Sequence, residues 1–290
     1  MQPTSAEKTG QAERASGGAS GAESGDAALL DAITGAAAAA ARGIAARSGQ
    51  RAHLDVRAKA ASDFVSEVDI EAETLIRTLL AARFPGAHLM GEELAPGAPP
   101  ARGLTFVIDP LDGTTNFLHG YPEYAVSIAA AVDGELAAGV VHNVATGEVF
   151  TARRGAGAFR NGEPMSVSAV DDPQRALIGT GFPFRAVDVL ADYVHQFHAV
   201  ARATAGIRRA GSAALDLADV ACGRFDAFWE PLLSPWDFAA GALLVREAGG
   251  IATDLAGGPI ALARGSILAG NPALHRWLLD LLSSLPRQTR

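Results

Sequence analysis

The sequence predicts a layered α/β (α+β) fold in which helices cover mixed β-sheets. Short apolar runs separated by tight turns between residues 104 and 160 are typical of antiparallel strands, and strand and helix patterns alternate from residue 176 onward. Of the 290 residues, 49% are hydrophobic and 19% are charged, which is enough apolar material for a sizeable core. We therefore expect two layered sub-domains, an α+β unit at 27–175 and an α/β unit at 176–290.

The first sub-domain is predicted to begin with an alanine-rich helix over 27–47 and to contain a second helix over 68–84, which Pro85 and Gly86 end. Between them, the polar residues 48–61 indicate a loop or extended segment. A short strand at 88–90 and a Pro/Gly loop at 95–102 precede a buried strand at 104–108. A hairpin over 125–133 and 135–143 turns at Asp133 and Gly134, and strands at 148–151 and 158–160 continue the sheet.

The second sub-domain is predicted to alternate strands with helices. Strand patterns lie at 176–180, near residue 207 and at 226–229. Helix patterns follow them at 187–204, 213–221 and 238–247. This alternation is typical of a sheet covered by helices.

The N-terminal segment 1–26 is rich in Gly, Ser, Ala and Glu, and we expect a disordered tail because it cannot bury enough apolar surface. It lacks the basic start and apolar stretch of a secretory signal. We see no run of about 20 largely apolar residues that would predict a membrane span. The expectation is therefore a cytoplasmic protein that does not bind membranes.

The charge balance is acidic, with 24 Lys and Arg against 32 Asp and Glu and a net charge of −8. A protein whose main ligand is nucleic acid usually carries a clustered basic surface, so we do not expect that class. The single cysteine, Cys222, excludes an intrachain disulfide framework and a cysteine-based zinc site. A second explanation of the acidic balance is a cluster of carboxylates that binds cations.

The segment from Asp109 to Phe117 is the most informative part of the chain. A buried strand delivers Asp109 at its end, and Asp112 follows three residues later. Two carboxylates at that spacing can share hard cations such as Mg²⁺, which prefers oxygen ligands. Gly113 lets the chain turn and brings backbone N–H groups near a ligand. Taken alone, Asp-x-x-Asp favours the ordinary interpretation, an Asx turn with a helix cap.

Three other acidic segments strengthen the functional interpretation. Glu92 and Glu93 follow a short apolar strand, Asp237 precedes an apolar helix, and Asp69 lies at a predicted helix start. Each has an ordinary alternative, a solvated loop for Glu92 and Glu93 and a helix cap for Asp237 and Asp69. Their joint occurrence with the Asp109 segment favours a common site.

On these motifs the chain resembles the inositol monophosphatase family of lithium-sensitive, Mg²⁺-dependent phosphatases, in its bacterial form. The matching segments are 91–93, 109–117, 120–122, 236–237 and 247–250, with 63–69 and 181–185 matching bacterial members, and the resemblance covers roughly residues 29–282. It implies the sugar-phosphatase fold, in which helices and mixed sheets alternate as αβαβα.

The resemblance implies Mg²⁺ as the cofactor, with two ions and a looser third that would lean on Glu92. Glu92, Asp109 and the carbonyl oxygen of Leu111 would bind one ion. Asp109, Asp112 and Asp237 would bind the second.

The resemblance also implies the remaining site residues. Backbone N–H groups of Gly113 and Thr114 would hold the phosphate, while Asp69 and the Thr114 hydroxyl would orient the attacking water. The expected catalytic residues are thus Asp69, Glu92, Asp109 and Thr114, and the expected substrate-binding residues are Gly113, Thr114, Gly211, Ser212, Ala213, Glu230, Asp237 and Arg185. Arg185 could reach the pocket or a partner subunit, and Arg208 and Arg209 could anchor a phosphate or be surface charge.

The expected reaction is Mg²⁺-dependent hydrolysis of a small phosphate monoester, with myo-inositol monophosphate as the leading substrate. Histidinol phosphate is the alternative substrate within the same class. An alternative of another class is a regulatory, transcription-associated binding protein on the same fold, but the complete set of carboxylates favours an enzyme. The resemblance also implies a homodimer.

Overall fold

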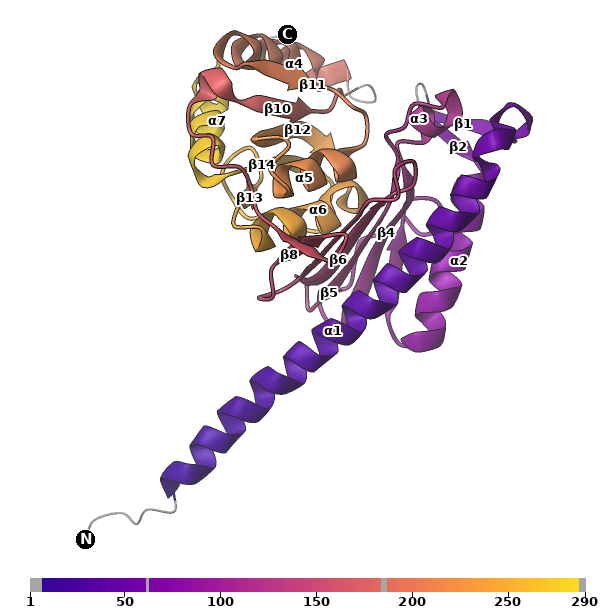
Figure 1. Cartoon of the computed structure of the whole chain (residues 1–290), viewed down its shortest axis with the longest axis vertical. Helices are drawn as coiled ribbons and strands as arrows, with labels where there is room; N and C mark the ends of the chain where they lie inside the picture. Colours follow the sequence, from indigo (N-terminus) through magenta and orange to yellow (C-terminus); the bar gives the residue numbers. More distant parts are fainter. Residues whose placement is uncertain (1–6, 61–62, 184–186, 287–290) are drawn as a thin grey trace.

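The structure, a computed structural model, describes residues 7–60, 63–183 and 187–286 and arranges them in alternating layers (Figure 1). Helices α1 (Glu7–Arg47) and α2 (Glu67–Arg83) cover one face of a seven-stranded sheet. Helices α5 (Ala213–Ala221) and α6 (Pro235–Glu247) lie between that sheet and a five-stranded sheet. Helices α4 (Val187–Ala203) and α7 (Pro272–Ser284) cover the outer face of the second sheet. The predicted αβαβα layering is confirmed.

The seven-stranded sheet has the strands in chain order. β3 (His88–Gly91) and β4 (Leu104–Asp112) are parallel, and every later pair is antiparallel. The remaining strands are β5 (Ala125–Val132), β6 (Glu135–Asn143), β7 (Val149–Arg153), β8 (Ala158–Arg160) and β9 (Glu163–Met165). The predicted hairpin and strands of this segment are therefore present, with β4 longer than the 104–108 that we expected.

Strand β5 shows why the central strands read as unbroken apolar runs. Side chains alternate between the two faces of a sheet, and here helices cover both faces. Val126, Ile128 and Ala130 pack toward α1 and α2. Ala125, Ala129 and Ala131 pack toward α5 and α6.

The five-stranded sheet has the order β11-β10-β12-β14-β13. β10 (Leu177–Thr180) runs parallel to β11 (Gly206–Arg208) and β12 (Ala227–Leu233), and β14 (Gly265–Gly270) runs antiparallel to both β12 and β13 (Ile251–Thr253). We predicted neither β13 and β14 nor α7, so the structure adds the last two strands and the last helix. The boundary between the sub-domains stays a prediction.

Helix α1 begins at Glu7, so its backbone is helical over residues 7–26, for which we expected a disordered tail. Figure 1 shows these first turns extending away from the body of the molecule. The difference has a simple cause, because extending an existing helix by one residue costs far less than nucleating one, and the well-packed 27–47 segment supplies the nucleus.

One segment of the described residues, Gly25–Arg51, is long and apolar enough to cross a membrane by length and composition alone. We expected no such run, because we gave little weight to the small alanine side chains, and this finding corrects that expectation. The core helix of a soluble protein can be equally long and apolar, and 44% of the 18-residue apolar window within this segment is buried inside the structure. Ala36, Ala37, Ala40 and Ala41 pack in the core beneath the seven-stranded sheet, so the alanines serve close packing.

The segment expected to be a loop or extended contains a 3₁₀ helix, η1 (Ser48–His53), and strand β1 (Val56–Ala60). β1 pairs with β2 (Asp63–Ser66) as an antiparallel hairpin that leads directly into α2. A second 3₁₀ helix, η2 (Pro173–Arg175), precedes β10, and the short helix α3 (Thr114–His119) follows β4.

Candidate active site

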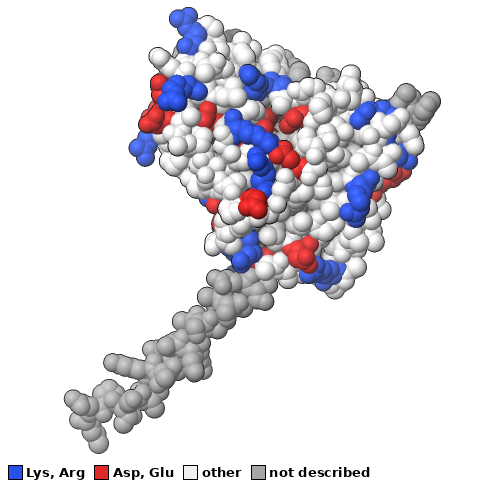
Figure 2. Space-filling view, viewed as in Figure 1, with Lys and Arg blue, Asp and Glu red and all other residues white. Residues whose placement is uncertain are grey.

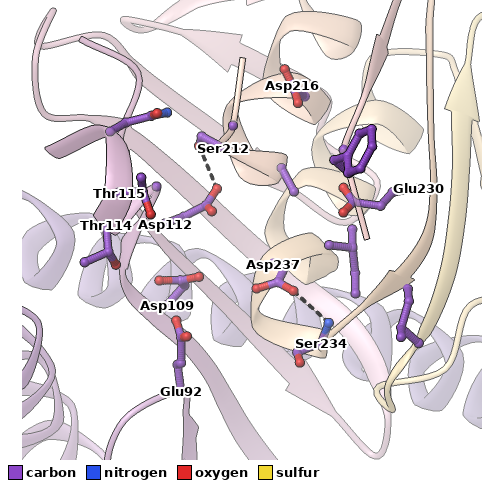
Figure 3. Close-up of a pocket in the computed structure, with 18 of the residues that line it drawn as sticks. Glu92, Asp109, Asp112, Thr114, Thr115, Ser212, Asp216, Glu230, Ser234 and Asp237 are labelled. Carbon is purple, nitrogen blue, oxygen red and sulfur yellow. Dashed lines mark hydrogen bonds between the residues drawn. The ribbon is translucent and has the colours of Figure 1, made fainter. Parts of the chain in front are cut away.

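A cavity of about 430 Å³ lies where β4 and β12 end and where α3, α5 and α6 begin. Figure 3 shows its carboxylates gathered around a common space. The predicted site residues that line it are Glu92, Asp109, Leu111, Asp112, Gly113, Thr114, Gly211, Ser212, Ala213, Glu230 and Asp237. Asp69 does not line the cavity but contacts it through Thr114, and Arg185 lies outside the described residues.

A bulge in β4 places Asp109 and Asp112 on one face of the sheet. Asp109 pairs with Ser127 and Asp112 with Ala125, so three steps along β4 match two along β5. Without the extra residue, side chains three positions apart would point to opposite faces. Both carboxylates therefore point to the face where Ala125 packs toward α5 and α6, which is the cavity side.

Asp69 both caps a helix and contacts a cavity residue. It is the third residue of α2, and its Oδ2 accepts hydrogen bonds from the Ser66 N–H at 2.9 Å and the Ser66 hydroxyl at 2.6 Å. Its Oδ1 accepts a hydrogen bond from the Thr114 hydroxyl at 2.8 Å. Asp69 can therefore be both a helix cap and a site residue, because its Oδ2 accepts the capping hydrogen bonds and its Oδ1 accepts the hydrogen bond from Thr114.

Asp237 repeats this arrangement at α6. Helix α6 begins at Pro235 rather than at 238, which places Asp237 in the first turn. Its Oδ2 accepts a hydrogen bond from the Ser234 N–H at 2.7 Å, and the same side chain lines the cavity (Figure 3). The capping box holds the Asp237 carboxylate in the first turn of α6 through Oδ2, so the capping hydrogen bond does not involve Oδ1.

Glu92 lies at the end of β3, in a loop that a second, buried glutamate holds. Glu73 of α2 is fully buried and accepts hydrogen bonds from the backbone N–H groups of Glu93 at 2.7 Å and Leu94 at 3.2 Å. A side chain on Gly91 would place its Cβ 2.2 Å from a Glu73 carboxylate oxygen, which explains the glycine of the Gly-Glu-Glu motif.

Sequence reasoning missed Glu73, although a signal for it exists. Its position on α2 shares a face with the buried Ala72, Ile76 and Leu80. A charged residue on the apolar face of a helix is rarely buried unless it is paired. Here Arg77, one turn later, approaches it at 3.5 Å.

The start of α5 holds Asp112. Ser212 caps this helix, and its hydroxyl donates a hydrogen bond to Asp112 Oδ2 at 2.6 Å, while the Ala214 N–H donates to the same oxygen at 2.8 Å. Ser212 was predicted to bind substrate. In the structure its hydroxyl contacts a predicted metal ligand, and its role toward substrate stays a prediction.

Gly113 and Asn116 join the first sheet to the loop before α5. Gly113 has φ 87°, and a Cβ there would lie 2.7 Å from the Glu123 carbonyl oxygen, so glycine is required on both counts. The Asn116 side-chain amide donates to the carbonyl oxygens of Glu123 at 2.7 Å and Ala210 at 3.0 Å. These contacts bring the Gly211 segment against the backbone of Gly113.

Burial and mutual repulsion raise the pKa values of the cavity carboxylates. Burial, then the charges of Glu92, Asp112 and Asp237, raises the pKa of Asp109 well above its usual range. The pKa of Asp237 is also raised well above its usual range, by burial and then by the charges of Glu92 and Asp112. Burial raises the pKa of Asp112 to about 6 and that of Glu230 to about 8. A bound cation would relieve this repulsion.

The donor set fits Mg²⁺, because this ion prefers carboxylate and carbonyl oxygens. As the side chains stand, no three His, Cys, Asp or Glu residues within 7–60, 63–183 and 187–286 converge closely enough to form a metal cage. The carboxylates nevertheless share one cavity and raise one another's pKa values. The fit therefore rests on donor type and charge, and the ligand assignment stays a prediction.

Several lining residues were not predicted as site residues. Arg209, which we could interpret equally as a phosphate anchor or surface charge, lines the cavity and lowers the pKa values of Glu230 and Asp112. Arg264 and Asp216 also line it. Elsewhere, Figure 2 shows basic and acidic side chains interspersed over one face of the molecule.

Known proteins resemble this chain over most of its length. Residues 26–287 match the inositol monophosphatase family. Nus factor SuhB of Pseudomonas aeruginosa is 48% identical over 233 residues, which cover 79% of this chain and 86% of that protein. Inositol-1-monophosphatase of Rhizobium meliloti is 43% identical over 255 residues, covering 88% and 96%.

Solved structures share the fold. Extragenic suppressor protein suhB from Bartonella henselae superposes with a TM-score of 0.84 at 41% identity, covering 89% of this chain and 99% of that one. Inositol monophosphatase from Anabaena superposes with a TM-score of 0.79 at 35% identity, covering 89% and 96%. Sequence and structure comparisons therefore agree on one family.

Proposed function

The chain belongs to the inositol monophosphatase family, and on that premise we propose that it hydrolyses a small phosphate monoester with Mg²⁺ as cofactor. The leading substrate is myo-inositol monophosphate, which gives inositol and inorganic phosphate. One observation carries the proposal: Glu92, Asp109 and Asp237, from three distant segments, line one cavity. Carboxylates so gathered are costly unless they hold a cation, which the reaction of a phosphate dianion also needs.

Glu92, Asp109 and the Leu111 carbonyl oxygen would hold one Mg²⁺, and Asp109, Asp112 and Asp237 a second, with Glu92 also available to a looser third. When bound, the ions neutralise developing charge on the phosphoryl group and favour deprotonation of a nearby water. The protein keeps these ligands in place through its own contacts. Ser212 and the start of α5 hold Asp112, and Ser234 holds Asp237.

Asp69 and Thr114 would orient the attacking water. The Thr114 hydroxyl directs its hydrogen toward Asp69 at 2.8 Å and toward the Leu111 carbonyl oxygen at 3.1 Å, so a lone pair of its oxygen stays available to accept a hydrogen bond from the water. The water oxygen would bond to phosphorus as the ester P–O bond breaks, and the leaving alkoxide would take up the proton that the attacking water loses. The backbone N–H groups of Gly113 and Thr114, at the start of α3, would bind phosphate oxygens.

The alcohol part of the substrate would lie between the Gly211–Ala213 segment and Glu230. Glu230 lines the cavity beside Arg209, and burial raises its pKa to about 8, so it can carry a proton near neutral pH and share it with a substrate hydroxyl. Histidinol phosphate remains the alternative substrate, since an ammonium or imidazole group would also bind near a carboxyl group.

Relatives named Nus factor SuhB favour a second candidate, a regulatory, transcription-associated binding protein on the same fold. The retained carboxylates support the enzyme, because a purely regulatory protein has no need of them. We further propose a cytoplasmic homodimer. Sedimentation of the full chain should give twice the monomer mass of 29.7 kDa, and a monomer would contradict this part of the proposal.

The test is phosphate release by the purified full chain from myo-inositol 1-phosphate, histidinol phosphate and fructose 1,6-bisphosphate, with Mg²⁺ or with EDTA. We expect release with Mg²⁺ only, fastest from the inositol ester. Asp109→Asn should lower turnover by about 100-fold or more, whereas Asp280→Asn, on the exposed side of α7, should not. Absence of release from every ester with Mg²⁺ would reject the enzyme in favour of the binding role.

A further inference from the structure

We infer that Asp216 determines substrate specificity by accepting a hydrogen bond from the alcohol part of the substrate, at the end of the cavity away from Glu92. The inference rests on the proposed function and deepens it. It assigns the substrate to monoesters whose alcohol carries a hydrogen-bond donor beyond the phosphate.

The position of Asp216 supports this role. It lies on α5, one turn after Ser212, whose hydroxyl holds Asp112. Figure 3 shows Asp216 on the Ser212 side of the cavity, with Glu92 at the opposite end. Since Gly113 and Thr114 would hold the phosphate, a residue beyond Ser212 would face the alcohol rather than the phosphoryl group.

The hydrogen bonding of Asp216 is incomplete. The residue is only 2% exposed, and its Oδ1 is buried with no hydrogen-bond partner in the described part of the chain. A buried carboxylate oxygen without a partner destabilises the folded protein, and nearly all such atoms are satisfied in native structures. Oδ1 itself is closed to solvent, but because Asp216 lines the cavity, a bound ligand can supply a donor to its carboxyl group.

The surroundings of Asp216 specify the kind of group that it would accept. Burial raises its pKa well above the usual range, followed by the charges of Glu230, Asp112, Asp219 and Glu123. Four carboxyl groups act on Asp216, against the guanidinium of Arg209 beside Glu230 in the same cavity, so this end of the cavity disfavours a second anionic group and favours a donor. A hydroxyl of a polyol and the ammonium group of an amino alcohol share that chemistry.

The experiment compares two variants of the full chain with the wild type. Asp216→Ala removes the acceptor, whereas Asp216→Asn keeps an oxygen in the same place. Asp280→Asn is the control, because Asp280 lies on the exposed side of α7 and does not line the cavity. The substrates are myo-inositol 1-phosphate, histidinol phosphate and p-nitrophenyl phosphate, whose alcohol part has no donor.

We expect Asp216→Ala to lower kcat/KM for the inositol ester by about 10-fold or more and Asp216→Asn to recover most of it. Release from p-nitrophenyl phosphate should stay within about twofold of wild type. A parallel loss for histidinol phosphate would assign the contact to its ammonium group as well. The melting temperature of Asp216→Ala should equal or exceed that of the wild type, since the unpartnered carboxylate is gone.

Two results would overturn the inference. An equal loss on all three esters would make Asp216 a structural residue, and unchanged kinetics for the inositol ester would leave it without a role in binding. Ligand binding, measured as the rise in melting temperature on adding myo-inositol 1-phosphate, separates this failure from that of the proposed function. A wild type that binds but releases no phosphate rejects the reaction, whereas an equal rise in wild type and Asp216→Ala rejects the contact.

Discussion

Replacing Glu73 by alanine should perturb the proposed Mg²⁺ site through a residue that is neither a proposed metal ligand nor a proposed substrate-binding residue. The buried carboxylate of Glu73 accepts the backbone N–H groups of Glu93 and Leu94, which follow Glu92 directly. Hydrogen bonds to a charged group contribute about 1.5–3 kcal/mol each. Burial raises the pKa of Glu73, so desolvation offsets part of this gain. We expect a net loss of about 2 kcal/mol in the free energy of unfolding.

That loss corresponds to a decrease of about 3 °C in the melting temperature of a chain of this size. The free loop would also place Glu92 poorly, and residues that orient metal ligands typically affect metal affinity by about 10-fold or more. Glu73→Ala should therefore need about tenfold more Mg²⁺ for half-maximal phosphate release and for half of the Mg²⁺-induced rise in melting temperature. Glu73→Gln, which keeps an acceptor, should lie between Glu73→Ala and wild type.

The matched control is Glu71→Ala, an exposed position of the same helix. Gly91→Ala adds a second test, because its Cβ would meet the Glu73 carboxylate at 2.2 Å. Gly91→Ala should therefore destabilise the wild type more than it destabilises Glu73→Ala, so the two effects should not add. Additive effects, or a wild-type Mg²⁺ midpoint in Glu73→Ala, would refute the reasoning.

Three further predictions follow from the site. Ser212→Ala removes the 2.6 Å hydrogen bond to Asp112, so the affinity for Mg²⁺ should fall about tenfold while the substrate KM at saturating Mg²⁺ stays unchanged. A raised KM with unchanged Mg²⁺ affinity would instead indicate that Ser212 contacts the substrate. Without metal, the melting temperature should fall as the pH rises from about 4 to about 8, because the folded protein raises the pKa of Asp112 to about 6 and of Glu230 to about 8. Protons stabilise the folded state until the pH exceeds the folded-state pKa values of these two groups. Saturating Mg²⁺ should flatten the dependence of the melting temperature on pH. A melting temperature that rises with pH would contradict this prediction. Asn116→Ala removes the hydrogen bonds to the Glu123 and Ala210 carbonyl oxygens and should lower the free energy of unfolding, measured in urea, by about 2 kcal/mol. An unchanged free energy of unfolding would mean that water replaces both hydrogen bonds fully.

Much of the fold was predictable because local patterns match the packing. The apolar runs of β5 and β6 are long because both faces of the sheet are covered, and the glycines at the turns mark where they end. The site was predictable for a related reason. Glu92 directly follows β3, Asp109 lies at the bulge near the end of β4, and Asp237 lies in the first turn of α6. Such ends converge at one edge of layered sheets.

The remainder depends on contacts between distant segments, which no local pattern encodes. The bulge that turns Asp109 and Asp112 to one face becomes visible only in the register of β4 against β5. Glu73 acts on a loop about 20 residues later, and Ser212 on a carboxylate 100 residues earlier. β13 and β14 were missed because Gly and Pro interrupt the segment from 249 to 272, where the sheet supplies the order that the sequence lacks. Helix α7 does carry a local signal, the cap Asn271 followed by Pro272 and an amphipathic run, and it was overlooked.

The most direct test of the central claim is a Mg²⁺ titration of phosphate release from myo-inositol 1-phosphate by wild type and Asp237→Asn. Asparagine can still accept the Ser234 N–H, so the helix cap and the fold should be kept. The account predicts saturable activation of the wild type and a loss of about 100-fold in Asp237→Asn, with a metal-free melting temperature no lower than that of wild type. Release that does not need Mg²⁺, or near-normal turnover in the variant, would contradict it.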